Sequence, residues 1–241
     1  MAYAGLAGLK KYQQEQQEKA EARDRPKAEW FTSVFPKKTG DSVNVVFLQE
    51  LDEGAENYDA EKGIGFIEVE HHGPGKDGFK RRATCTLESE GQCYADERHS
   101  ASYKTVDDYK GDWKQRSNLY INVAVEVDGE WKPFVLSRNA NSTFTEALIQ
   151  EAIDEGSITN SVYRINKTGS GTKTQWLPKR LPKVALPDVS GLQVFDINET
   201  VLRHIPYEKQ PEWYGDAAPV TQSNETESKS SAGDTSADAD W

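Results

Sequence analysis

The sequence LYINVAVEVDGEWKPFVL (residues 119–136) decides the expected fold. Apolar residues occupy every second position over Leu119–Val127, which is the pattern of a strand with one buried face. Asp128-Gly129 is typical of a tight turn between antiparallel strands, and Trp131–Leu136 supplies the second strand. We therefore expect a β-hairpin in the middle of the chain.

Similar short runs lie on both sides of this hairpin. Further expected strands are Val43–Leu48, Gly65–His71, Phe79–Cys85, Val162–Lys167 and Thr172–Leu177. A helix is expected from Thr143 to about Asp154, because Thr143 and Glu146 fit a capping box and Gly156 is a stop signal. Several short antiparallel strands with one helix predict a small, mainly β barrel, although a β-sandwich would give the same pattern.

Composition divides the chain into three segments. Residues 1–28 carry Leu6, Leu9 and Tyr12 at helical spacing within a charged arm. Residues 29–206 hold nearly all the β-branched and aromatic residues and form the expected core. Residues 207–241 are rich in Ser, Thr, Asp and Glu, and are expected to be disordered.

The formal net charge is −11, which at first argues against nucleic acid as a partner. From Glu212 onward, seven acids and one lysine contribute −6, so the rest of the chain carries −5. A nucleic-acid site would therefore be a local basic track, such as the acid-free stretch between Glu155 and Asp188. With neither a signal peptide nor an apolar run of membrane-spanning length, we expect a cytoplasmic protein.

Aromatic rings beside cations are the main functional signal, because rings stack on bases while cations contact phosphates. The candidate rings are Tyr103, Tyr109, Trp113, Tyr120, Trp131 and Trp176. The candidate phosphate contacts are Lys80, Arg81, Arg82, Lys114, Arg116, Arg138, Lys173 and Arg180. The alternative is that these rings fill the core beside solvated lysines. The polar stretch from Tyr103 to Arg116 favours the binding interpretation, since rings on a loop suggest a binding surface.

Two cysteines and two histidines form a second group. Cys85 and Cys93 follow His71 and His72, and Asp96 or His99 would complete a tetrahedral set. Buried thiols with surface histidines are an equally good interpretation. Signatures of catalysis are missing from the sequence: Gly169-Ser170-Gly171 fits a hairpin turn rather than a phosphate loop, and there is no nucleophile elbow. We therefore expect a binding protein and not an enzyme.

The order of these features resembles the helix-destabilising, single-stranded DNA-binding proteins of tailed phages of the T-even type. The resemblance rests on the N-terminal helix, His72-Gly73, the spaced cysteines, the strand Leu119–Val123 and the acidic C-terminus. It implies an OB-fold core at 29–206 with an inserted subdomain around 71–117. It also implies one zinc ion, with ligands carried over to His72, Cys85 and Cys93, and with Asp96 at the position of a family cysteine.

The same resemblance gives roles to the two ends of the chain. It implies self-association along DNA through the N-terminal arm, with Leu6, Leu9, Lys10, Lys11 and Tyr12 as docking residues. It implies recruitment of replication and recombination proteins by the C-terminal tail. The ending Asp238-Ala239-Asp240-Trp241 is similar to the tails of bacterial single-strand binders, in which a terminal ring anchors in a partner.

We therefore expect sequence-independent binding and protection of single-stranded DNA in phage replication, recombination and repair, in the host cytoplasm. One alternative is an acidic adaptor of a replication complex that does not bind DNA itself. Another is a recombination or repair enzyme with a hidden metal site, for which the sequence offers no cluster of carboxylates.

Overall fold

The computed structural model describes residues 27–35, 38, 40–75, 77–105, 112–169 and 174–215, and at the N-terminus residues 6, 9, 10, 12, 13 and 16. For residues 103–105 only the backbone is described. The strands are β1 (Ser42–Phe47), β2 (Phe66–His72), β3 (Arg82–Thr84), β4 (Gln115–Val127), β5 (Glu130–Asn139), β6 (Val162–Thr168) and β7 (Gln175–Arg180). The α-helices are α2 (Phe31–Val34), α3 (Leu87–Glu90), α4 (Tyr94–Thr105), α5 (Thr143–Glu155), α6 (Ile197–Thr200) and α7 (Gln210–Tyr214). Two 3₁₀ turns are η1 (Gly78–Lys80) and η3 (Tyr207–Lys209).

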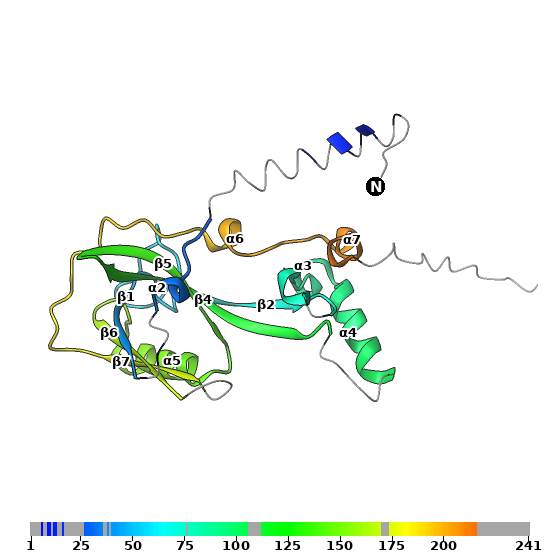
Figure 1. Ribbon diagram of the computed structural model, residues 1–241. Helices are drawn as coiled ribbons and strands as arrows, with labels where there is room; N and C mark the ends of the chain where they lie inside the picture. Colours follow the sequence, from blue (N-terminus) through cyan, green and yellow to red (C-terminus); the bar gives the residue numbers. More distant parts are fainter. Residues whose placement is uncertain are drawn as a thin grey trace, which may run out of the picture.

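All seven described strands belong to one antiparallel sheet (Figure 1). Six of them follow the order β3-β2-β4-β1-β6-β7, and β5 pairs with β4. The long strand β4 connects two regions, because its first part pairs with β2 and its second part pairs with β1. The expected hairpin is β4–β5, and Asp128 and Gly129 both have positive φ angles, as a tight hairpin turn requires. The prediction of a mainly β, antiparallel chain is confirmed.

Strands β1, β4, β5, β6 and β7 with helix α5 form what we call the main unit. Its core consists of the alternate residues of each strand, as the period-two pattern predicted. Fully buried members include Val45, Ile121, Val123, Leu136 and Ile165, and α5 adds Phe144 and Leu148 from one side. Each such side chain contributes roughly 1.5–3 kcal/mol through burial.

Residues 181–202, here called the strap, cross the outer face of this sheet. Leu192 and Val194 pack with Val46 of β1, while further along Ile197 and Leu202 pack with other outward-facing residues. Asn122 on β4 holds the strap through two hydrogen bonds with the backbone of Phe195, at 3.0 Å each. Figure 1 shows the strap passing over β5 on its way to α6.

The residues between β1 and β4 form an inserted subdomain that contains β2, β3, α3 and α4, with α7 packed against it. Figure 1 shows β2 and β4 extending from the main unit toward α3, α4 and α7. Its apolar core is small. The buried members are Ala83, Cys93, Tyr94, Ala95, Trp113 and Tyr214.

The segment expected to be a polar loop from Tyr103 to Arg116 is different in the structure. Helix α4 continues to Thr105, and β4 begins at Gln115. Sequence periodicity missed α4 because the helix has no apolar stripe, although Asp96 and Glu97 in its first turn favour a helix N-terminus. A smaller difference is that Ser142, not Thr143, caps α5 by accepting from the backbone N–H of Thr145.

The boundary of the disordered tail at residue 207 was placed too early. Residues 207–215 form η3 and α7, and Gln210 and Tyr214 are fully buried. The prediction of disorder rested on the polar and acidic composition of residues 207–241 as a whole. Three rings at the start of this segment, Tyr207, Trp213 and Tyr214, supply the apolar surface that lets it fold. The remaining tail, 216–241, lies outside the described residues, as do Lys11 and the expected anchor Asp238, Asp240 and Trp241.

In the N-terminal arm, the described residues Leu6, Leu9 and Tyr12 are helical and exposed. None of the helices within the described ranges combines the length and the apolar character needed to cross a bilayer.

Candidate functional site

Three side chains typical of metal ligands meet in the inserted subdomain. The ligand atoms of His71, Cys85 and Cys93 all lie within 4.8 Å of one another, and both cysteines are free thiols. His71 is on β2, Cys85 directly follows β3, and Cys93 directly precedes α4. The pairing of β2 with β3 places His71 and Cys85 close together, and the turn that contains α3 brings Cys93 back to them. The chain therefore brings together one nitrogen and two sulfur donors.

The orientation of His71 fits a metal ligand. Its Nδ1 lies 3.0 Å from the carbonyl oxygen of Trp113, so Nδ1–H donates there and the lone pair is left on Nε2. Nε2 is buried and has no hydrogen-bond partner among the described residues. Burial lowers the pKa of His71, which favours the neutral, ligating form. A buried nitrogen with an unused lone pair beside two thiols is what a zinc ion would satisfy.

His72, the histidine expected from the sequence, is not in this group. Neighbouring residues of a strand point to opposite faces of the sheet, so His71 and His72 cannot both face the cysteines. The expected set is thus corrected to His71 with Cys85 and Cys93.

Asp96 lies at the edge of the group. Its Oδ1 is 3.9 Å from His71 Nε2, and its side chain is about one third exposed, at 35%. Burial, together with the neighbouring Cys93, raises the pKa of the Cys85 thiol to about 11. A cation at this point would oppose that effect, because it stabilises the thiolate.

A second feature is the outward face of β3, β2 and β4, where several predicted cations gather. His72 pairs with Arg82 across β2 and β3, and Glu70 pairs with Arg116 across β2 and β4, so all four residues share one face. The backbone N–H of His72 also donates to the carbonyl of Lys114. Burial lowers the pKa of His72, and the positive charges of Arg116 and Arg82 lower it further. We call Arg82, His72, Lys114 and Arg116 the basic face.

The carboxylate of Glu70 contacts residues of β3 and β4 at this face. It is fully buried, accepts hydrogen bonds from Tyr120 and Asn118, and lies 3.5 Å from Arg82 Nε. One cation of the basic face is therefore neutralised. Arg116 and Lys114 are exposed, and neither forms an ion pair with a carboxylate of the described residues.

Trp30 was missed by the sequence analysis as a site residue. It is half-buried, and the guanidinium of Arg82 lies 5.7 Å from its ring centroid. A bridge between Trp30 and Val135 of β5 brings it there, a long-range contact that local sequence patterns do not reveal.

Most of the predicted stacking rings occupy other places. Trp113, Tyr120 and Trp176 are buried at 4%, 0% and 7% exposure and belong to apolar cores, so in this structure they cannot stack on bases. Trp131 is half-buried against the outer-face cluster. Tyr109 and the side chain of Tyr103 lie outside the described residues.

The remaining predicted cations are also dispersed. Arg180 pairs with Glu155 and does not reach the basic face. Arg138 lies over the Trp176 ring at 4.1 Å, with its Nε buried and unpaired. Lys80 pairs with Asp77 at 2.9 Å, and Arg81 donates to the carbonyl of Tyr214. Lys173 lies outside the described residues.

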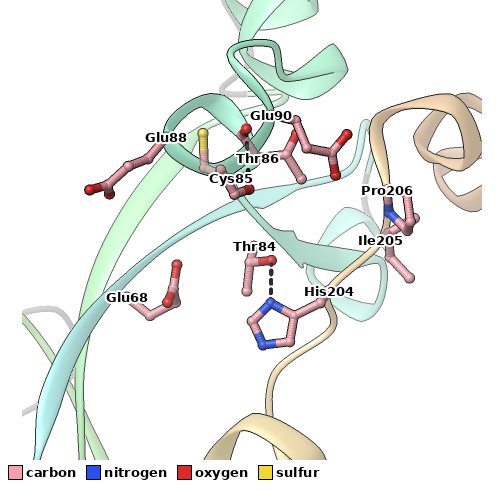
Figure 2. A pocket seen from close by; sticks show the side chains of 10 residues that line it. Glu68, Thr84, Cys85, Thr86, Glu88, Glu90, His204, Ile205 and Pro206 are labelled. Atoms are coloured by element: carbon pink, nitrogen blue, oxygen red, sulfur yellow. Dashed lines mark hydrogen bonds between the residues drawn. The ribbon is translucent and has the colours of Figure 1, made fainter.

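A pocket of about 310 Å³ lies beside Cys85, and its lining residues Glu68 and Thr84 are on the same face of the sheet as Glu70 and His72. Figure 2 shows Glu68 and His204 across the pocket from Glu88 and Glu90. Burial raises the pKa of Glu68, and the carboxylates of Glu70 and Glu88 raise it further. Three acids on its walls make this pocket unsuitable for phosphate, in contrast to the basic face.

Comparison of the chain with protein-family models, with curated proteins and with solved structures finds no match.

Proposed function

We propose that the protein binds single-stranded DNA without sequence preference, and that the basic face contacts its phosphates. The observation that carries this proposal is the placement of Arg82, His72 and Arg116 on one face of three adjacent strands, with Lys114 beside them. In a chain of net charge −11, two adjacent exposed cations at this face, Lys114 and Arg116, favour a polyanionic partner.

Trp30 adds a ring to the cations. Its partial exposure beside Arg82 suits stacking on one base, a contact that contributes roughly 1–3 kcal/mol and does not depend on base identity. Because Trp113, Tyr120 and Trp176 are buried in the cores, fewer rings can stack on bases than the sequence predicted. Contacts with phosphates should therefore supply a larger part of the binding free energy.

The strand connectivity of the main unit supports an OB-fold. The five-stranded OB-fold has a three-strand meander, a helix, and then a final hairpin whose first strand returns to strand one. Here β1, β4 and β5 precede α5, and β6 of the β6–β7 hairpin pairs with β1. Arg138 on β5, lying over Trp176 on β7, bridges the two strands that would close the barrel.

Zinc is the metal we propose for His71, Cys85 and Cys93. Tetrahedral zinc places sulfur and nitrogen ligands about 3.5–3.8 Å apart, compatible with a group whose ligand atoms all lie within 4.8 Å. Two candidates for the fourth ligand lie nearby: Asp96, with its Oδ1 3.9 Å from His71 Nε2, and His99, with its ring centroid 6.5 Å from that of His71. The ion would hold together a subdomain whose own apolar core is small.

A matched pair of double variants tests the DNA site. In Lys114→Gln/Arg116→Gln two exposed cations of the basic face are removed, while in Arg164→Gln/Lys179→Gln two exposed cations that pair across β6 and β7 are removed. Anisotropy of a labelled dT oligonucleotide should show about tenfold weaker binding for the first variant, and a salt slope smaller by about 1.4, because each lost phosphate contact removes about 0.7.

The control variant should bind like the wild type. Equal binding by both variants would reject the basic face as the site. No binding by the wild type would reject the function and favour the adaptor alternative.

A further inference from the structure

The C-terminal residues 203–215, which we call the clamp, lie against the candidate metal centre. The backbone of β3 is joined to the clamp where Thr84 N–H donates to the carbonyl of Arg203 at 3.0 Å. At the other end, Arg81 Nη1 donates to the carbonyl of Tyr214 at 2.8 Å. Between these two points the clamp follows the inserted subdomain rather than the main unit.

Gln210 is the centre of this contact. It is fully buried, and its side-chain amide makes four hydrogen bonds. Oε1 accepts from the Cys93 thiol at 3.7 Å, a bond that is given up when the thiolate binds metal, and from the backbone N–H of Ala95 at 3.4 Å, a bond that does not depend on the thiol proton. Nε2 donates to Thr86 Oγ1 and to the carbonyl of Ile205, both at 3.0 Å.

These hydrogen bonds involve residues next to both cysteines in the chain. Thr86 follows Cys85 in the chain, and its hydroxyl donates to the carbonyl of Gln92, which precedes Cys93. The amide of Gln210 thus connects the two turns that present the sulfur atoms. The third ligand is contacted through its backbone, because Tyr214 Oη donates to the carbonyl of His71 at 3.3 Å.

We propose that Gln210 is a positioning residue of the metal centre, and that metal binding and seating of the clamp stabilise each other. The proposal rests on the zinc site proposed above but not on DNA binding. Outer partners of metal ligands hold them in place, and their loss weakens metal binding by about 10–100-fold. Linkage requires the metal to stabilise the seated clamp by the same factor by which the seated clamp strengthens metal binding.

This coupling has a consequence for the acidic C-terminus. Residue 216, where the remaining chain of 26 residues starts, follows the clamp directly in the sequence. Metal occupancy therefore determines how firmly the origin of this acidic stretch is held at the inserted subdomain.

Zinc affinity of the full chain, measured by competition with a fluorescent chelator, tests the role of Gln210. Gln210→Ala should bind zinc about 10–100-fold more weakly than the wild type. The matched control is Gln193→Ala, which replaces an exposed glutamine of the strap and should leave zinc affinity unchanged. Equal affinity of wild type and Gln210→Ala would overturn the proposal, and so would a wild type that binds no zinc.

A second measurement needs no variant. Hydrogen exchange of the wild type should show slower exchange of the clamp amides, such as those of Tyr207 and Gln210, when zinc is added. Unchanged exchange there would contradict the coupling even if Gln210→Ala failed to fold. Neither measurement involves DNA, so their failure is separable from failure of the proposed DNA binding.

Discussion

The main unit and the inserted subdomain are stabilised in different ways. The main unit buries a continuous aliphatic and aromatic core on the inner face of five strands and under α5. The apolar cluster of the subdomain contains six buried side chains, two of which are alanines and one a candidate metal ligand. The subdomain is held instead by buried polar contacts, of which the four bonds of Gln210 are the clearest case.

This difference indicates where a metal ion has the most effect. An ion that joins β2, the end of β3 and the start of α4 compensates for missing apolar burial in the subdomain. The main unit needs no such link, because apolar burial alone supports it. The two regions should therefore respond separately to metal removal and to core mutation.

Loss of a metal ligand is expected to have the largest effect. Cys93→Ser should lower zinc affinity by more than about a thousandfold, since serine is a poor zinc ligand and the apparent free energy of structural sites is on the order of 10 kcal/mol. Amides of α4 and the clamp should then exchange rapidly, whereas those of β1 and β6 stay protected. Equal loss of protection in both regions would contradict their separation.

A core mutation in the main unit should lower the stability of the protein and leave zinc binding unchanged. Leu136→Ala removes a fully buried side chain, so the free energy of unfolding should fall by about 2–5 kcal/mol in urea titrations. Zinc affinity should be retained. Leu177→Ala, at an exposed leucine of β7, should change stability by less than about 0.5 kcal/mol. Similar values for the two variants would show that Leu136 does not support the main unit.

The sequence predicted the main unit well because its signals are local. Strand β4 alternates, Asp128-Gly129 forms the turn, and Gly156 ends α5 at a positive φ. The site was predicted less well. Whether Trp176 fills the core or faces solvent, and whether His71 or His72 faces the cysteines, depends on pairing between distant strands. A shift of one residue in that pairing would exchange the two faces.

The smallest expected effect concerns Glu68, on β2 near the junction of the two regions. Burial raises its pKa, so the folded state binds the proton more readily than the unfolded chain. The stability from this group is therefore fully present below pH 4.5 and is lost as the pH rises through the folded pKa. Glu68→Gln should therefore raise the free energy of unfolding at pH 7 by less than about 1 kcal/mol, because solvent screens this partly exposed group.

Urea titrations from pH 4 to pH 7 should then show a flatter profile for Glu68→Gln than for the wild type. The control is Glu126→Gln at an exposed acid of β4 outside the pocket that Glu68 lines, which should retain the wild-type profile. A Glu68→Gln variant less stable than the wild type at pH 7 would contradict the burial argument.

The salt dependence of dT binding by the wild type tests the central claim most directly. The two exposed cations of the basic face without an ion-pair partner among the described residues, Lys114 and Arg116, give an expected slope of log affinity against log salt near about −1.4. Affinity should then fall by about sevenfold between 50 and 200 mM salt. Absence of saturable binding at 50 mM, or affinity that does not change with salt, would contradict the assignment of the basic face to single-stranded DNA.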